Sequence, residues 1–506
     1  MVTATVTAPD HEVVVIGAGF SGIGAAIKLD NAGVADYLVV DEGDGVGGAW
    51  HWNTYPGVAV DIPSFSYQFS FEKRADWSRV YAPGGELKAY AEHCVDAYDV
   101  RRRLRLNTRI TAATFDESEH LWRLDTDAGD VITARFVIGA SGALSQPKWP
   151  EIEGVDDYAG VTRHTSRWDH TQDLTGKRVA IIGTGASAIQ VIPKAAEIVE
   201  HLTVFQRTPI WCLPKPDRAL SDRERWLLRW VPGARLATRV LSQVFVEINF
   251  PLSAHFYGIV PLADRGEAVG RHLLRKQVQD PETREKLTPR YGLGCKRPSF
   301  SNEYLPTFNR ANVSLETTGI ERITAAGVRT VDGVEHSVDV LIHATGFKVF
   351  EPGYPIHGVG GVELDAWWDA NRAQAYEGVS VPEFPNLFSI IGPYGFNGAS
   401  FFLLIETQMR HITRCLKRAR ETGATWVEIT AEANHRYFTS MLSRRHNQIF
   451  FRDTCATANS YYFDRHGDVP FRASPSLETI WRAAPVRPRR LPVRNAHDRG
   501  GEKRWP

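Results

Sequence analysis

Two glycine-rich turns in this 506-residue chain have the spacing that dinucleotide binding requires. The first, GAGFSG, places Gly17, Gly19 and Gly22 directly after an apolar run that ends at Ile16. In such a turn the first glycine makes the tight bend, the second lets the backbone approach a pyrophosphate, and the third allows close packing of helix on strand. The N-terminus of the following helix then faces the phosphates. The sequence therefore predicts a dinucleotide site at this turn.

A second turn, GTGASA, repeats the pattern but differs in the residue that would contact the ribose. Asp41 lies 24 residues after Gly17, and Arg207 lies 24 residues after Gly183. A carboxylate accepts hydrogen bonds from an unmodified ribose and repels a 2′-phosphate, whereas an arginine attracts that phosphate. We therefore expect FAD at the first turn and NADPH, rather than NADH, at the second, with hydride passing from nicotinamide to flavin. The candidate NADPH-binding residues of the second turn are Gly183, Thr184, Gly185, Ser187 and Ala188.

Strands and helices are expected to hold both turns in place. Val13 to Ile16 is an apolar run typical of a buried parallel strand, and Gly33 is a suitable helix stop. Two further buried strands are expected within 337–347 and 384–393, and an amphipathic helix is expected from 401 to Gly423. The predicted fold is α/β, with two Rossmann-like dinucleotide-binding domains and a helical insertion.

The composition of the chain suggests that each domain is built from separated segments. Pro147 and Pro150 indicate a crossing between the domains, and helical periodicity in an Arg-, Leu- and Trp-rich region indicates the insertion. The apolar stretch 241–263 within that insertion is interpreted as buried core or pocket wall, with contact to a membrane surface as the alternative. The expected division is 1–145 and 381–481 for the FAD domain, 146–216 and 291–380 for the NADPH domain, 217–290 for the insertion, and 482–506 for a loosely ordered basic tail.

Composition and charge exclude several other classes of protein. Lys+Arg and Asp+Glu both number 59, which argues against a nucleic-acid partner. The five cysteines form no CxxC pair, so neither a thioredoxin-like site nor a paired redox disulfide is expected, and a reducing cytoplasm is favoured. The first residues do not resemble a signal peptide, and no apolar run is long enough to span a membrane. No metal site is expected.

The stretch YAGVTRHTSRWDH lies between the two turns and contains regularly spaced candidate residues. These are Tyr158, Gly160, His164, Trp168 and Asp169. Together with GGAWHWNTYPGVAVD and GCKRPSFSNEYLPTFNRANV, it resembles the motifs of type I Baeyer–Villiger monooxygenases, with Tyr158 where phenylalanine is usual. The resemblance extends from about residue 11 to 481. It implies that this fingerprint links the two nucleotide domains and that His164 positions cofactor and domains rather than reacting.

The resemblance also implies roles for residues in the other two motifs. Asp61 would lie close to the flavin and form a pair with Arg297. Lys296 would contact the 2′-phosphate of NADPH together with Arg207 and Thr208. The residues implied to be flavin neighbours are Phe20, Trp50, Tyr67 and Ile110.

Arg297 is the candidate catalytic residue. In the expected reaction NADPH reduces FAD, and oxygen adds at C4a of the flavin to give a peroxide, which must stay anionic to attack a ketone carbonyl. An arginine has a pKa above about 12, so it supplies a permanent positive charge and does not donate the proton that would quench the nucleophile. The expected product is an ester or lactone, with one oxygen atom inserted next to the carbonyl.

Three other functions share some of these features. A flavin-containing monooxygenase acting on nitrogen or sulfur would have both turns, but it usually has Tyr or Phe where Trp168 stands. A pyridine-nucleotide disulfide reductase needs a cysteine pair beside the flavin. A non-catalytic dinucleotide-binding sensor or scaffold would not require Asp61, Lys296 and Arg297 together. The sequence does not identify the ketone or the oligomeric state.

Overall fold

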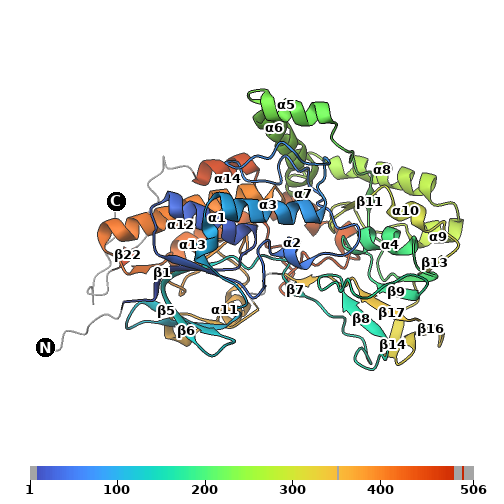
Figure 1. The fold of residues 1–506 in the computed structure, drawn as a ribbon, viewed down its shortest axis with the longest axis horizontal. Helices are drawn as coiled ribbons and strands as arrows, with labels where there is room; N and C mark the ends of the chain where they lie inside the picture. Colours follow the sequence, from blue (N-terminus) through green and yellow to red (C-terminus); the bar gives the residue numbers. More distant parts are fainter. Residues whose placement is uncertain (1–7, 350–352, 484–492, 495–506) are drawn as a thin grey trace.

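The computed structural model describes residues 8–349, 353–483 and 493–494, and two sheets with parallel strands organise them (Figure 1). The larger sheet has eight strands. One of them, β20 (Leu387–Ser389), pairs only with β6 and lies outside the linear order of the other seven. The order of the other strands is β19 (Ile356–His357), β4 (Ile110–Asp116), β5 (Leu121–Thr126), β6 (Val131–Gly139), β1 (His11–Ile16), β2 (Tyr37–Val40) and β3 (Leu104–Arg105). β1 is parallel to β2 and β6, whereas β5 is antiparallel to β4 and β6.

Both faces of this sheet are covered, which explains the continuous apolar run in β1. Val13 and Val15 belong to one core cluster, and Val14 belongs to another on the opposite face. Side chains of α1 (Phe20–Asn31), α3 (Gly84–Ala97) and α12 (Phe401–Thr422) contribute to the first cluster, and those of α11 (Leu364–Asn371) to the second. The predicted buried parallel strand is therefore confirmed. The helix predicted to stop at Gly423 is confirmed as α12, whose C-cap is Gly423 at φ +68°.

The smaller sheet is entirely parallel and holds the second glycine turn. Its order is β13 (Val313–Glu316), β10 (His201–Phe205), β9 (Arg178–Ile182), β17 (Val340–His343) and β8 (Val161–His164). The turn joins β9 to α4 (Ala188–Ala196), and a three-stranded sheet of β14 (Ile320–Thr324), β15 (Gly327–Thr330) and β16 (Glu335–Ser337) packs nearby. The α/β class with two Rossmann-like cores is confirmed, as are the strands expected within 337–347 and 384–393, at β17 and β20.

The two chain crossings between the sheets run side by side. β7 (Gln146–Pro147) leads to the smaller sheet and pairs antiparallel with β18 (Phe347–Lys348), which leads back. The chain re-enters the larger sheet at β19, earlier than the boundary expected at residue 381, and α11 packs against that sheet as well. A two-residue strand has too little periodicity to reveal this return in the sequence.

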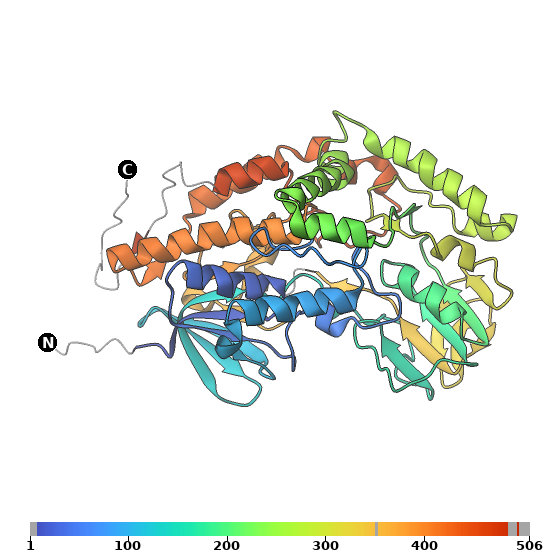
Figure 2. The ribbon, with the colours of Figure 1, turned by 45° about the horizontal axis from the view of Figure 1, so that its top comes forward.

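Helices form the segment between residues 217 and 290, as expected. They are α5 (Asp222–Trp230), α6 (Ala234–Glu247), the π-helical turn η2 (Ile248–Leu252), α7 (Ser253–His255), α8 (Leu262–Gln277) and α9 (Pro281–Lys286). Ser221 and Glu224 form a capping box that begins α5. The parallel pair β11 (Cys212–Leu213) and β12 (Ser299–Phe300) joins the two ends of the insertion. Figure 2 shows these helices above both sheets.

The C-terminal part contains α13 (Ala431–Leu442) and α14 (Ser476–Ala483), of which α14 packs against α12, while β21 (Trp426–Val427) pairs with β22 (Val493–Arg494). Most of the tail predicted from Arg482 onward lies outside the described residues. Within the described part, no helix combines the length and apolarity needed to cross a membrane. The remaining short elements are α2 (Ala49–Trp52), η1 (Val100–Arg103), α10 (Tyr304–Thr307), η3 (Val359–Gly361), η4 (Arg445–Asn447), η5 (Ile449–Phe451) and η6 (Asp453–Cys455).

Candidate active site

Two glycines of the first turn, Gly17 and Gly22, have no room for a side chain. Gly17 has φ +115°, and a Cβ there would lie 2.6 Å from the carbonyl oxygen of Ala140. A Cβ at Gly22 would overlap the carbonyl oxygen of Gly17, so helix α1 approaches the turn as closely as a backbone can. A Cβ at Gly19 would lie 3.4 Å from Gly48 Cα, which brings the second motif against the turn.

Asp41 stabilises the same turn from the end of β2. Its Oδ2 accepts a hydrogen bond of 2.5 Å from the Ala18 N–H, and its Oδ1 accepts one of 2.8 Å from Gly43 N–H. Each carboxylate oxygen has about two acceptor sites, so both retain capacity for ribose hydroxyls. The position therefore fits the ribose contact expected from the sequence.

The second glycine turn has a matching geometry. Gly183 has φ +112°, and a Cβ there would lie 2.5 Å from the Ala344 carbonyl oxygen, whereas no atom lies within 4 Å of a Cβ at Gly185. Thr184 donates a hydrogen bond of 3.2 Å to the Thr208 carbonyl, and Ser187 precedes α4 as its N-cap residue. The open side of Gly185 leaves space for a phosphate at the helix N-terminus.

Two cations lie together beside this turn. The pKa of Lys296 is lowered by burial and, secondarily, by the positive charge of Arg207. Neither side chain has a carboxylate partner within 4 Å in the described part of the chain. Thr208 Oγ1 accepts a hydrogen bond of 3.0 Å from Asn459. Adjacent cations without an acidic partner are suited to binding an anion such as a phosphate.

Asp61 and Arg297 form an ion pair although 236 residues separate them. The Asp61 Oδ2 accepts from Arg297 Nε at 3.0 Å and from Nη2 at 2.7 Å. Burial opposes the charge of Arg297, but Asp61, with smaller contributions from Tyr462 and Tyr461, outweighs it and raises its pKa. The guanidinium therefore stays charged, and about a quarter of the side chain remains exposed.

Aromatic rings gather between this ion pair and the first turn. The Tyr67 hydroxyl accepts a hydrogen bond of 3.1 Å from Trp50 Nε1, and its ring lies 5.0 Å from that of Phe402. Phe402 in turn lies 4.6 Å from Phe20. Ile110 is not part of this group, because it packs on the opposite face of the larger sheet. Of the four residues implied to be flavin neighbours, Phe20, Trp50 and Tyr67 thus belong together.

The first half of the fingerprint segment is built into the smaller sheet. Tyr158 donates a hydrogen bond of 3.0 Å to the Val338 carbonyl, and a Cβ at Gly160 would overlap its hydroxyl. His164 is fully buried in β8, with Nδ1 2.8 Å from the Ser166 hydroxyl. Burial lowers the pKa of His164 to about 4, so the ring is neutral near pH 7.

The second half of the fingerprint segment reaches the larger domain. Arg167 lies 4.0 Å from the Trp52 ring and 3.7 Å from Glu42, while His170 Nε2 lies 2.9 Å from the Thr54 hydroxyl. Within the segment, Arg163 lies 5.2 Å from the Trp168 ring and donates to the carbonyl of Asp169 at 3.0 Å. Sequence reasoning missed the contacts of Arg167 and His170, because no spacing rule connects them to residues 42–54.

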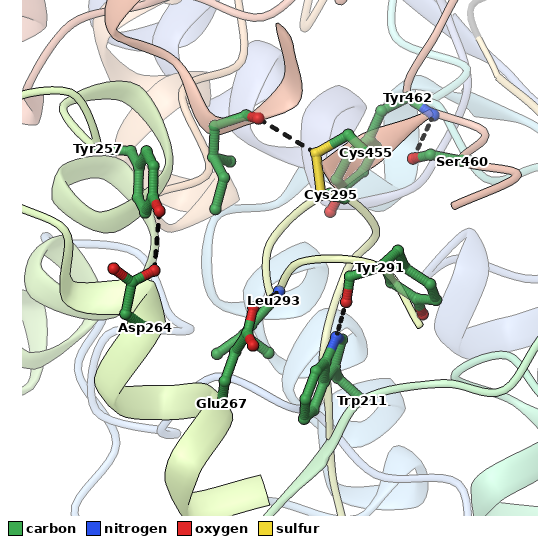
Figure 3. The surroundings of a disulfide bond; sticks show 11 residues. Trp211, Tyr257, Asp264, Glu267, Tyr291, Leu293, Cys295, Cys455, Ser460 and Tyr462 are labelled. Carbon is green, nitrogen blue, oxygen red and sulfur yellow. Dashed lines mark hydrogen bonds between the residues drawn. A yellow bond between two sulfur atoms is a disulfide. The ribbon is translucent and has the colours of Figure 1, made fainter. Parts of the chain in front are cut away.

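A disulfide joins Cys295, the residue before Lys296, to Cys455 (Figure 3). The lack of a CxxC pair argued only against a redox pair at close spacing, so this disulfide was not predicted from the sequence. The two cysteines are 160 residues apart, and such a spacing carries no local signal. The Thr454 carbonyl also accepts a hydrogen bond of 3.2 Å from Gly292 N–H, so the loop 291–297 is fastened to the segment that continues to Asn459, Tyr461 and Tyr462. Asn459, Tyr461 and Tyr462 are therefore further candidate site residues, and no sequence motif predicted them.

We expect that Cys455→Ser destabilises the protein by about 2–5 kcal/mol, because the cross-link closes a long loop in the unfolded chain. The KM for NADPH should rise as well, since the segment carrying Asn459 would lose its attachment to the Lys296 loop. Denaturant unfolding and steady-state kinetics measure the two effects. Cys94→Ser, at a free buried cysteine in α3, is the matched control and should leave the KM unchanged.

The thiol count gives an independent readout of this cross-link. Denatured wild-type protein should show three reactive thiols before reduction and five after it, corresponding to free Cys94, Cys212 and Cys415 plus the reduced pair. Five thiols without reductant, or an unchanged KM in Cys455→Ser, would contradict the expectation.

Comparisons with known proteins agree with this geometry. Residues 14–223 match the family described as pyridine nucleotide-disulphide oxidoreductase, a range that contains neither Cys295 nor Cys455. A Baeyer–Villiger monooxygenase of Pseudomonas aeruginosa is 39% identical over 433 residues, covering 84% of this chain and 81% of that protein. The crystal structure of an OTEMO complex with FAD and NADP has a TM-score of 0.84 at 30% identity, covering 94% of this chain and 97% of that one. The closed crystal structure of cyclohexanone monooxygenase has the same TM-score, identity and coverage.

Proposed function

Because the chain belongs to the Baeyer–Villiger monooxygenases, we propose that it oxidises an apolar ketone with Arg297 as the catalytic charge and Asp61 as its partner. It is an FAD- and NADP-dependent oxidoreductase that inserts one atom of O₂ next to a carbonyl. The Asp61–Arg297 ion pair supports the proposed residue roles. The Arg297 guanidinium is permanently charged, and its side chain is still partly exposed. We further propose that the protein works in the cytoplasm, where NADPH is supplied. This proposal rests on the cofactor, because the Cys295–Cys455 disulfide removes the argument from cysteine usage.

The described residues fit FAD at the first turn. Gly17 and Gly22 allow the tight turn and the close approach of α1, Gly19 would let the backbone approach a pyrophosphate, and the first N–H groups of α1 are available there. Asp41 is placed for the ribose hydroxyls, and Ile110 lies near that end, because Thr108 N–H donates to the Asp41 carbonyl at 2.9 Å. Phe20, Trp50 and Tyr67 would enclose the isoalloxazine end.

The second turn fits NADPH. Arg207 and Lys296 would share the 2′-phosphate, which supplies the negative charge that these neighbouring cations lack in the described structure. Thr208 is held in place by Asn459 and Thr184. Lys296 directly precedes Arg297 in the chain, and the Cys295–Cys455 disulfide fastens the loop that carries both.

When bound, FAD accepts hydride from NADPH and activates O₂ beside its ring. Arg297 would stabilise the negative charge that develops on oxygen as the carbonyl is attacked. Because its guanidinium does not give up a proton near neutral pH, it stabilises that charge without neutralising it. Asp61 would orient the guanidinium through its two hydrogen bonds, and the neutral His164 would support the domain contact without exchanging protons in the reaction.

Product analysis tests this function directly. The holoenzyme with NADPH and ¹⁸O₂ is expected to convert an apolar cyclic ketone into a lactone that carries one labelled oxygen atom, with one NADPH consumed per product. A thioether and a tertiary amine are tested in parallel. Formation of sulfoxide or N-oxide without ester from any member of a linear, cyclic and aromatic ketone panel would favour the nitrogen- and sulfur-oxidising alternative.

A further inference from the structure

The outer face of the helical insertion is apolar although it faces solvent. Six side chains of α6 and η2 are between 40% and 72% exposed, and their spacing places them along one side of the helix: Leu236, Val240, Leu241, Val244, Phe245 and Ile248. The opposite side is attached to the protein, since Ser242 is buried with its hydroxyl 2.8 Å from that of Ser66. Arg239 donates to the Gln68 carbonyl at 2.6 Å on that inner side.

α5 extends this apolar surface with two tryptophans. Trp226 is 56% exposed and Trp230 is 65% exposed, next to Leu227 and Val231. Figure 1 shows α5 and α6 as the outermost elements at the top of the view, beyond the helices that cover the larger sheet. We call these ten residues the α5–α6 face: Trp226, Leu227, Trp230, Val231, Leu236, Val240, Leu241, Val244, Phe245 and Ile248. A contiguous exposed apolar surface of this kind marks an interaction site.

The charges around the α5–α6 face indicate the chemistry of its partner. From Ser221 to Ile248 the sequence has five arginines, of which Arg239 lies on the inner side, and three acidic residues. The acidic side chains are engaged within the protein: Asp222 pairs with Arg225, Glu224 pairs with Arg218, and Glu247 accepts a hydrogen bond from the Ser476 N–H. Arg229 and Arg235 are exposed, and Arg229 lies 5.7 Å from the Trp230 ring. Tryptophan is favoured at the boundary between lipid headgroups and acyl chains, and arginine is attracted to anionic headgroups. In a two-fold symmetric dimer built on this face, arginines would instead meet arginines.

The same helical segment connects the α5–α6 face with the candidate active site. α6 continues without a break into η2, where Ile248 is exposed and Phe250, two residues later, is partly buried against the core. The Phe250 ring lies 6.3 Å from that of Tyr462, edge to face. Tyr462 is close enough to Arg297 to raise its pKa, as described above. One short helical segment and the Phe250–Tyr462 ring contact therefore connect the α5–α6 face with the surroundings of Arg297.

We propose that the α5–α6 face binds the surface of an anionic phospholipid bilayer, with its tryptophans and leucines at acyl-chain level and its arginines at the phosphates. The protein rests on the bilayer and does not span it. Uptake of the ketone from that bilayer is the second part of the inference and depends on the proposed function, whereas lipid binding does not.

Vesicle co-sedimentation of the holoenzyme tests the binding. We expect binding to vesicles of phosphatidylcholine with phosphatidylglycerol, and weaker binding to phosphatidylcholine alone. The double variant Trp230→Ser/Leu241→Ser loses one large apolar side chain from each helix. Its vesicle partition coefficient should fall at least about tenfold, since each buried apolar side chain contributes to interfacial binding.

The charge of the face is tested by a second double variant. Arg229→Gln/Arg235→Gln should abolish the difference in binding between the two lipid compositions. Val331→Ser/Val334→Ser, at exposed valines of the β15–β16 hairpin, is the matched control and should bind like wild type.

Two outcomes would overturn the inference. One is wild-type protein that does not sediment with either vesicle preparation. The other is a dimer in analytical ultracentrifugation that Trp230→Ser/Leu241→Ser dissociates, without vesicle binding, which would make the α5–α6 face an interface between copies of the chain.

An activity measurement separates the two parts of the inference. In Trp230→Ser/Leu241→Ser, kcat/KM for a short ketone dissolved in water should match wild type, while turnover of a long-chain ketone supplied in vesicles should fall at least about tenfold, in line with the lost partition. Equal turnover of the vesicle-borne ketone by both proteins would refute uptake from the bilayer. Vesicle binding without oxidation of any ketone would leave the docking surface in place and refute the proposed function.

Discussion

Arg297→Ala is expected to abolish ester formation while FAD stays bound and is still reduced by NADPH. The variant removes the positive charge that would stabilise oxygen, and loss of a single group that stabilises a developing oxyanion lowers kcat by about 10²–10³-fold. It also leaves Asp61, its ion-pair partner at 2.7 Å, without a counter-charge. Stopped-flow absorbance measures flavin reduction, and product chromatography measures the ester.

Two further variants distinguish a catalytic charge from a structural contact. Arg297→Lys keeps a positive charge but has a group that can donate its proton, so it should retain less activity than wild type and release more hydrogen peroxide per NADPH. Arg218→Ala removes a surface arginine paired with Glu224 and is the matched control, expected to behave as wild type. A normal ester yield from Arg297→Ala would refute the assignment of this residue.

Arg207→Ala should raise the KM for NADPH by about 10- to 100-fold, which corresponds to loss of one or two charge-assisted hydrogen bonds to the 2′-phosphate. The KM for NADH should change little, because NADH has no phosphate at that position. Arg310→Ala, at an exposed arginine of the same domain, controls for general loss of surface charge. The ratio of kcat/KM for the two nucleotides is the measurement, and an unchanged ratio would count against the assignment.

The pH dependence of the same variant tests whether Lys296 shares the phosphate. Burial and the charge of Arg207 both lower the pKa of Lys296, so its positive charge is present at low pH and is lost as pH rises through that lowered pKa. The KM for NADPH should therefore increase on the alkaline side. In Arg207→Ala one cause of the lowering is gone, so the pKa of Lys296 rises and the alkaline increase in KM moves to higher pH. A shift to lower pH would contradict this coupling.

Local patterns in the sequence were sufficient for the framework of the fold. The strand Val13–Ile16, the glycine turns at Gly17 and Gly183, and the helix that stops at Gly423 each depend on residues close together in the chain. The equal spacing of Asp41 and Arg207 from their turns is also a local feature, because each unit is a strand, turn and helix followed by a second strand. The pairing of Ile356–His357 with the larger sheet was not predicted, since two residues show no periodicity.

The catalytic geometry depends on contacts that no spacing rule expresses. Motif resemblance implied that Asp61 and Arg297 meet, but only the packed structure brings them to 2.7 Å, since they lie in different segments on either side of the helical insertion. The Cys295–Cys455 disulfide and the contact of Arg167 with Trp52 likewise join distant segments. The sequence by itself therefore determined the two strand–turn–helix units and the opposite charges of Asp41 and Arg207 that follow their second strands. Tertiary packing decided which loops meet between them, because long-range pairing is selected by the fit of whole surfaces rather than by neighbouring residues.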